Sequence, residues 1–269
     1  MIDNFQFKEH YDINDLIDIV EILRSPEGCP WDREQDHKSI RRDFLEETYE
    51  VIEAINKDDK DMLLEELGDV LLQVVFHTQI EREKGAFELK DVADDICKKM
   101  IERHPHVFGD VNAETSEQVL ENWDIIKKRT KQQKSQTESM LSIPREFPAL
   151  MRADKVQKKA SKVGFDWDNA DGAFDKISEE LLELKQAYKE GNQENIHEEL
   201  GDLLFSVVNV SRFVKVDSEE ALTNSTDKFI DRFSKVEKMA SEQGLDMKNT
   251  DLATLDKLWD LAKKDKGSF

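Results

Sequence analysis

The chain has 269 residues, of which 39 are Lys or Arg and 60 are Asp or Glu, so its formal net charge is −21. That length suits one large domain or two smaller ones, each with its own core. Such an acidic chain argues against a protein that coats nucleic acid, which needs a basic face. The two cysteines, Cys29 and Cys97, favour a reducing cytoplasm over a disulfide framework. The apolar runs fall short of the roughly 20 residues that cross a bilayer, so we expect no membrane partner.

Helical periodicity runs along most of the chain. Only 10 residues are Gly and 5 are Pro, and apolar residues recur at helical spacing, as in Leu16, Ile19, Val20 and Leu23. Alternating runs typical of strands are nearly absent, which predicts an all-α fold. A polar stretch begins at Thr130 and is followed by prolines. We therefore predict a first domain at 1–129, a linker at 130–148 and a second domain at 149–269.

One block of sequence occurs twice without a gap, which indicates two tandem domains of about four helices each. Acidic residues, one leucine and one glycine of the first copy recur in the second at a constant offset. The first copy comprises Glu46, Glu47, Glu50, Glu65, Glu66, Leu67, Gly68 and Asp69, and the second comprises Glu179, Glu180, Glu183, Glu198, Glu199, Leu200, Gly201 and Asp202. The apolar residues that follow, Leu71, Val74 and Val75 against Leu204, Val207 and Val208, predict one buried stripe in each copy.

Four carboxylates in each copy are spaced to meet at one point. Two lie three residues apart on one predicted helix and two lie three apart on the next, so each pair shares a face. A short polar turn joins the helices, which makes them antiparallel neighbours. The two quartets are Glu47, Glu50, Glu66 and Asp69 in the first half, and Glu180, Glu183, Glu199 and Asp202 in the second. A solvated acidic face is the alternative interpretation.

Three features favour a metal site over that alternative. The acids adjoin the apolar stripe, they recur in register, and Gly68 and Gly201 lie inside helices at a cost of roughly 1 kcal/mol each. Such a glycine indicates the close approach of another group. Clustered carboxylates repel one another unless a cation neutralises them. A hard divalent ion, Mg²⁺ or alternatively Mn²⁺, prefers such oxygen ligands.

The combined motifs resemble a known family. The sequence is similar to the all-α nucleoside triphosphate pyrophosphohydrolases of the MazG type. The similarity lies in EExxE followed by EELGD, in KxxxR at Lys228 and Arg232, in a Trp-x-x-x-Lys element at Trp259 and Lys263, and in the segments CPWD, HPHVFGD and GFDWD. The resemblance covers nearly the whole chain. It implies tandem MazG-like domains, a homodimer, and Mg²⁺-dependent hydrolysis of nucleoside triphosphates of broad specificity to monophosphate and diphosphate.

The surroundings of the two quartets differ and favour the second half as the catalytic one. Lys176 occupies the position that Asp43 holds in the first half, and Asn195 replaces Met62. A triphosphate needs cationic and hydrogen-bonding groups beside the metal. By analogy with the family, the second quartet holds the metal and carries catalysis, whereas the first quartet is a second candidate metal site in a weakly active or inactive copy. The expected nucleotide contacts are Lys176, Asn195, Lys228, Arg232, Trp259 and Lys263.

Other interpretations remain open for the residues and for the function. Lys228 and Arg232 have the spacing of a solvated helix face, and Trp259 has apolar neighbours typical of a packing residue. The chain could instead be a helical module that binds metal or nucleotide without turnover. A related all-α enzyme specific for dUTP or dCTP is the third alternative. Base preference leaves no spacing signature.

Overall fold

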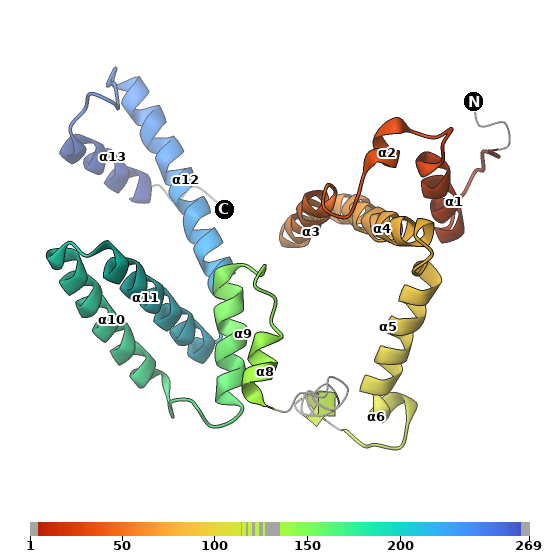
Figure 1. Cartoon of the computed structure of the whole chain (residues 1–269). Helices are drawn as coiled ribbons and strands as arrows, with labels where there is room; N and C mark the ends of the chain where they lie inside the picture. Colours follow the sequence, from red (N-terminus) through yellow and green to blue (C-terminus); the bar gives the residue numbers. More distant parts are fainter. Residues whose placement is uncertain are drawn as a thin grey trace. The chain divides into compact units, whose positions relative to one another are not determined.

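The computed structural model describes residues 5–113, 115, 116, 118, 119, 122, 123, 126 and 135–264. Every regular element in this part of the chain is a helix, which confirms the all-α prediction. The chain divides into two compact units, Met1–Lys127 and Lys128–Phe269, whose helices Figure 1 labels in chain order. No described helix combines the length and apolar composition that a membrane crossing requires.

The first unit is built around a hairpin of two long helices, α3 and α4. Its described helices are α1 (Ile13–Arg24), α2 (Pro30–Glu34), α3 (Arg41–Asn56), α4 (Lys60–Glu83), α5 (Leu89–Arg103) and α6 (Pro105–Phe108). The turn between α3 and α4 is short because Asp58 adopts a left-handed backbone with φ 51°. Asp59 then caps α4 by accepting hydrogen bonds from the amides of Asp61 and Met62. This turn brings the two halves of the first quartet together.

The core of the first unit lies between α1 and α4. Val20 of α1 is buried with Val75, Phe76 and Ile80 of α4. A side-chain pair closes the same interface, because the buried guanidinium of Arg24 donates to Glu83 at the end of α4. This packing covers one face of α4 and leaves another face for the acidic residues.

The second unit repeats the hairpin and adds helices on both sides of it. Its described helices are α8 (Gln136–Leu141), α9 (Ala149–Ser161), α10 (Ala170–Glu190), α11 (Gln193–Val214), α12 (Ser218–Glu242) and α13 (Leu252–Lys264). Gly191 ends α10 in the left-handed conformation, with φ 70°, where a side chain would be strained. Asn192 caps α11 through the amides of Glu194 and Asn195. The two-residue turn makes α10 and α11 neighbours, as Figure 1 shows.

Two further contacts organise the second unit. α9 packs against α11, where Nε2 of Gln157 donates to the backbone oxygen of Phe205 at 2.8 Å. α12 and α13 form their own hairpin around a buried cluster of Val236, Ala240, Leu258 and Ala262. Of the predicted linker, residues 130–134 lie outside the described residues, whereas the remainder includes α8, which packs against α9.

A single copy of the chain shows neither a fully buried apolar stripe nor a close approach to the helix glycines, so these two predictions are wrong for one copy. The apolar stripe is only partly buried: Val75 and Val208 are 1% exposed, but Leu71, Leu204 and Val207 are 42–49% exposed. Gly68 and Gly201 are likewise not approached, because a Cβ at either position would meet nothing within 4 Å. The periodicity identified one face of each helix correctly, but nothing in the described part of the chain covers it completely.

Candidate active site

The carboxylates of the second quartet converge on the α10–α11 hairpin. One oxygen each of Glu180, Glu199 and Asp202 lies within 4.8 Å of the other two. Glu183 belongs to an overlapping group with Glu180 and Glu179 on α10, at the same limit. Glu180 is the most enclosed member, with 4% of its surface exposed. The structure thus brings together the residues that helical spacing placed on facing sides of the two helices.

The first quartet forms the same arrangement on α3 and α4. Ligand oxygens of Glu47, Glu66 and Asp69 lie within 4.8 Å of one another. Glu50 lies close enough to interact with both Glu47 and Glu66. Three corresponding carboxylates of each quartet therefore meet within the same limit, and the groups around them distinguish the two units.

Clustering changes how these carboxyl groups bind protons. Burial raises the pKa of Glu199, and the neighbouring charges of Glu183 and Glu180 raise it further. Burial also raises the pKa of Glu66 and of Glu47, again with help from nearby carboxylates. A cation among these oxygens would replace the mutual repulsion with attraction and return the pKa values toward their usual range.

One cation already lies beside the second quartet. Nζ of Lys176 is 2.5 Å from Oε1 of Glu180 and 2.9 Å from Oε1 of Glu179. Hydrogen bonds to Glu180 and then Glu179 raise the pKa of Lys176, so it stays charged. In the first unit the corresponding residue is Asp43, which adds to the negative charge around Glu47. Sequence analysis identified this difference but did not foresee that Lys176 pairs with the quartet itself.

Comparison with known proteins identifies the family to which both hairpins belong. A family model described as the MazG nucleotide pyrophosphohydrolase domain matches residues 35–108 and 172–237, which include both quartets. The chain belongs to the MazG family. The predicted resemblance and the tandem arrangement are thereby confirmed.

Relatives in this MazG family match nearly the full chain. The nucleoside triphosphate pyrophosphohydrolase/pyrophosphatase MazG of Thermotoga maritima is 48% identical over 249 residues, covering 93% of this chain and 94% of the relative. The nucleoside triphosphate pyrophosphohydrolase of Escherichia coli K12 is 44% identical over 255 residues, covering 94% and 97%. The uncharacterized protein YabN of Bacillus subtilis is 45% identical over 258 residues, covering 95% of this chain and 52% of the relative.

The other predicted nucleotide contacts of this MazG chain are spread over three helices. Asn195 is exposed in the first turn of α11. Lys228 and Arg232 lie on α12 and form no ion pair with another described residue, whereas Lys263 on α13 pairs with Asp260 at 3.0 Å. α12 packs against α13 and against α9. Among the described residues, neither α12 nor α13 packs extensively against α10 or α11. Within one chain the structure does not bring these α12 and α13 residues to the second quartet.

Trp259 packs inside the α12–α13 hairpin of this MazG chain. It is half-buried against the cluster around Leu258, and its ring centroid lies 5.0 Å from that of Phe229. This environment matches the packing alternative, and the predicted nucleotide contact stays a prediction. Sequence analysis also assigned no role to Arg212, whose guanidinium pairs with both carboxylate oxygens of Asp166. The available signal for that loop was the segment GFDWD, in which Trp167-Asp168 echoes Trp31-Asp32 of CPWD.

Proposed function

We propose that this chain is a Mg²⁺-dependent nucleoside triphosphate pyrophosphohydrolase whose catalytic site is the second quartet. The observation that carries the proposal is the meeting of Glu180, Glu199 and Asp202 beside the Lys176 ammonium. Relatives aligned over most of the chain are named for this reaction. The reaction converts a nucleoside or deoxynucleoside triphosphate and water to the monophosphate and diphosphate.

The second quartet has the chemistry of a site for a hard divalent cation. It offers only carboxylate oxygens. The pKa of Glu199 is raised first by burial and then by repulsion from Glu183 and Glu180, and a cation would remove that repulsion. We propose that Glu180, Glu183, Glu199 and Asp202 hold Mg²⁺, with Mn²⁺ as a possible substitute. When bound, such an ion polarises phosphoryl oxygens and lowers the pKa of coordinated water. The first quartet is proposed as a second metal site.

The chain's own residues would bind and neutralise the substrate. Lys176 is held at the quartet and would compensate charge that develops on the departing diphosphate. Lys228 and Arg232 carry no described ion pair and would meet triphosphate oxygens. A quartet carboxylate, Glu180 or Glu183, would accept a proton from the attacking water. The oxygen of that water forms a bond to the α-phosphorus, and the bond between the α-phosphorus and the α–β bridging oxygen breaks.

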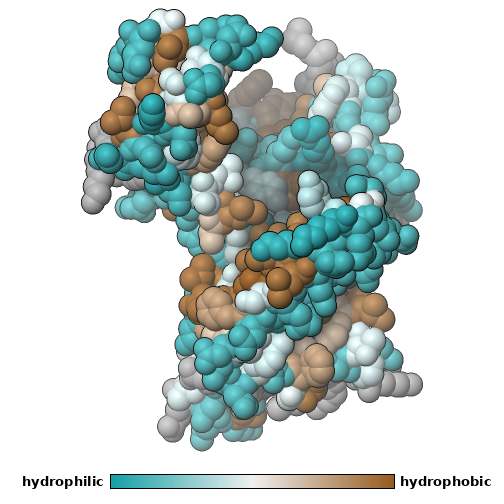
Figure 2. Space-filling model, turned by 90° about the vertical axis from the view of Figure 1, so that its left-hand side faces the viewer, coloured by the Kyte–Doolittle hydropathy of each residue, from teal (hydrophilic) through white to brown (hydrophobic). Residues whose placement is uncertain are grey.

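We propose a homodimer because the hairpin helices present apolar faces that nothing in the described chain covers. Figure 2 shows hydrophobic side chains open on the surface between hydrophilic ones. Exposed apolar residues on the second hairpin are Leu181, Leu182, Leu200, Leu204 and Val207. Faces of this kind mark interfaces. A second copy would also provide the neighbouring group for which Gly68 and Gly201 leave space. The α12–α13 hairpin of that copy would bring its Lys228 and Arg232 to a quartet.

Product analysis with matched variants tests the proposed reaction. The purified chain would be incubated with Mg²⁺ and a panel of ribo- and deoxyribonucleoside triphosphates, and diphosphate and orthophosphate would be measured separately. Glu183→Gln should abolish turnover and retain the helical fold, whereas the matched Glu50→Gln should have a much smaller effect. Equal losses from both variants would contradict the assignment of catalysis to the second unit.

The same panel separates the alternatives. Turnover of many nucleotides supports the broad specificity that we propose. Turnover of dUTP or dCTP alone would assign the chain to a specialised all-α enzyme. Unchanged nucleotide would favour a binding module, and orthophosphate with nucleoside diphosphate would show a different reaction.

A further inference from the structure

Two histidines of the first unit meet where the loop 35–40, between α2 and α3, lies against α4. Nδ1 of His37 in this loop is 2.8 Å from Nδ1 of His77 on α4. The two rings are within 15° of parallel and their centroids are 5.0 Å apart. Because the nitrogens are so much closer than the centroids, the rings meet edge to edge rather than face to face. Neither histidine belongs to a quartet, so the proposed function does not use this contact.

The carboxylate of Glu81 fixes the position of one proton on His37. Nε2 of His37 lies 2.6 Å from Oε1 of Glu81, and an ionised carboxylate can only accept a hydrogen bond. Nζ of Lys84 donates to the same oxygen at 2.6 Å. The hydrogen bond from Lys84, and then that from His37, lower the pKa of Glu81. Glu81 therefore stays ionised in mild acid, and His37 carries a proton on Nε2 throughout.

The space between the two Nδ1 atoms holds a single proton. A neutral His37 accepts a hydrogen bond from Nδ1–H of His77, whereas a protonated His37 donates one to a neutral His77. The first added proton therefore leaves the contact intact. A second added proton places N–H groups on both nitrogens, removes the accepting lone pair, and brings two cationic rings together. The contact is lost at this second protonation.

The surroundings of His77 oppose the second proton. Its ring is half-buried, and the ring of Phe44 on α3 lies 5.8 Å from it, centroid to centroid. Burial, and then the charge of His37, lower the pKa of His77. A base whose folded pKa is lowered contributes stability that is complete above its unfolded pKa of about 6.5 and is lost as pH falls through the folded value. Among the described residues, the charged groups around the pair are Glu81 and Lys84 of α4, Asp36 of the loop, and Arg24 of α1, which donates to the backbone oxygens of Asp32 and Gln35.

The histidine contact attaches one end of the loop 35–40 to α4. At the other end Ile40 is 3% exposed and belongs to the core of the first unit. Between these points the carboxylate of Asp36 accepts hydrogen bonds from the amides of Lys38 and Ser39. Hydrogen bonds from Ser39 and then Lys38 lower the pKa of Asp36, so it too stays ionised in mild acid. A response of the loop to mild acid therefore points to the histidines.

We propose that His37 and His77 form a proton-controlled latch, which holds the loop 35–40 on α4 and releases its His37 end when both imidazoles are protonated. A histidine titrates in the range where this change occurs, below about pH 6.5. α3 begins directly after the loop and carries Glu47 and Glu50 of the first quartet. Release therefore frees the segment that leads into this helix.

Hydrogen exchange of the loop amides tests the latch. The amides of Lys38, Ser39 and Ile40 are hydrogen-bonded within the loop, so their protection reports how firmly the loop is held. Exchange of the full-length chain would be followed by mass spectrometry at about pH 7.5 and about pH 5, with correction for the intrinsic rates. Protection of the loop should fall on the order of tenfold in acid. Protection of the α4 core from Val75 to Ile80 should stay unchanged.

Three variants separate proton control from packing. His77→Asn supplies both a donor and an acceptor, so it can bond to His37 in either protonation state and should keep the loop protected at both pH values. His77→Phe keeps an aromatic ring but can do neither, so it should leave the loop weakly protected at both. His10→Phe changes an exposed histidine ahead of α1 and should retain the wild-type response.

Imidazole ¹⁵N resonances give a second readout that a purely structural contact would not move. In the wild-type chain, His37 and His77 should titrate in two separate steps, because the second proton must break the shared hydrogen bond. In His77→Asn, His37 should titrate in a single step.

Four results would overturn the latch. The first is loop protection in the wild-type chain that is equal at both pH values, and the second is an acid-induced loss in His77→Asn that matches the wild type. An equal loss in the α4 core would show that the whole unit opens. Loss of loop protection at about pH 7.5 on addition of EDTA would assign the two nitrogens to a metal ion instead of a proton.

Discussion

Nζ of Lys176 lies 2.5 Å from Oε1 of Glu180, and this pair distinguishes two otherwise matching carboxylate clusters. The first unit has Asp43 at the corresponding position, and Glu47 there has a pKa raised by burial, by Asp69 and by other carboxylates that include Asp43. An anionic triphosphate would therefore meet a partly neutralised cluster in the second unit and an unrelieved acidic cluster in the first. The functional difference that we propose between the copies rests on this exchange of charge.

Removal of the Lys176 charge should impair turnover more than folding. Lys176→Gln is expected to lower kcat/KM on the order of tenfold to a hundredfold, because a charge-assisted contact to the departing diphosphate is lost. Steady-state kinetics with one nucleotide triphosphate measures this effect. Lys185→Gln, an exposed position on the same helix, is the matched control. A similar loss in both variants would indicate a general charge effect rather than a role at the quartet.

The raised pKa of Glu66 predicts that, without a bound metal, this residue destabilises the folded chain at high pH. A carboxyl group with a raised folded pKa contributes stability that is complete below its unfolded pKa and is lost as pH rises through the folded value. Glu66→Gln should therefore raise the thermal unfolding midpoint relative to wild type at about pH 8 but not at about pH 4. Mg²⁺ should raise the thermal unfolding midpoint of the wild type at the higher pH, because the cation removes the repulsion between the carboxylates. The difference in midpoint between wild type and Glu66→Gln should then become smaller.

The comparison with wild type matters because other carboxylates act in the opposite direction. Backbone hydrogen bonds from Ser39 and Lys38 lower the pKa of Asp36, whose contribution is lost as pH falls. Such terms cancel between wild type and Glu66→Gln. Glu65→Gln changes the exposed neighbouring residue and removes only a lesser cause of the raised Glu66 pKa, so its effect on the unfolding midpoint should be smaller. A Glu66→Gln difference that is constant with pH would contradict the prediction.

The Asp166–Arg212 pair should contribute more to stability than an exposed pair. Its side chains are 22% and 12% exposed, and Arg212 also donates to Asn209. Asp166→Ala is expected to lower the free energy of unfolding by about 1–3 kcal/mol, since a largely buried guanidinium loses its partner. Urea denaturation measures this, and a double-mutant cycle with Arg212→Met isolates the coupling.

An exposed pair in the same unit provides the stability control. Asp260 pairs with Lys263 on α13, and their side chains are 60% and 46% exposed. Asp260→Ala should change the free energy of unfolding by less than about 1 kcal/mol. Equal costs for Asp166→Ala and Asp260→Ala would mean that burial adds nothing to the Asp166–Arg212 pair.

Substitution at Gly201 should test the proposed homodimer. A Cβ there meets no atom of the described chain within 4 Å, so a larger residue causes no clash within one copy. Gly201→Leu should therefore keep the helical content of the chain but weaken self-association, because it fills space that a second copy would occupy. Sedimentation equilibrium measures the association. Ser241→Leu, at an exposed position near the end of α12, should leave it unchanged. A wild-type chain that is monomeric would refute the homodimer directly.

The sequence alone determined the helical repeat and the pairing of acidic residues within each hairpin. Helical spacing places Glu180 with Glu183, and Glu199 with Asp202, whatever surrounds them. Short polar turns with Gly191 and capping residues then bring the two helices together locally. These features follow from interactions between residues near one another in the chain, and therefore a sequence pattern predicts them.

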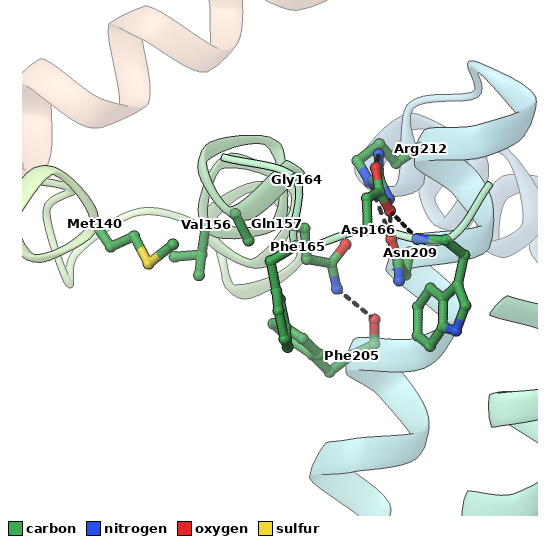
Figure 3. Close-up of a pocket in the computed structure, with 11 residues that line it drawn as sticks. Met140, Val156, Gln157, Gly164, Phe165, Asp166, Phe205, Asn209 and Arg212 are labelled. Carbon is green, nitrogen blue, oxygen red and sulfur yellow. Dashed lines mark hydrogen bonds and ion pairs between the residues drawn. The ribbon is translucent and has the colours of Figure 1, made fainter. Parts of the chain in front are cut away.

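The tertiary structure decided which faces are covered and which distant residues meet. Leu204 and Val207 follow the same apolar spacing as Val208, yet only Val208 is buried, because the helices packed on α11 cover that side chain and leave the other two exposed. A cavity in the second unit is lined by Gln157 of α9, Phe205 of α11 and Trp167 of the loop before α10 (Figure 3), and no spacing rule links those segments. Periodicity identifies the residues that share a face of one helix, but burial, ion pairing and cavity formation depend on the element packed against that face.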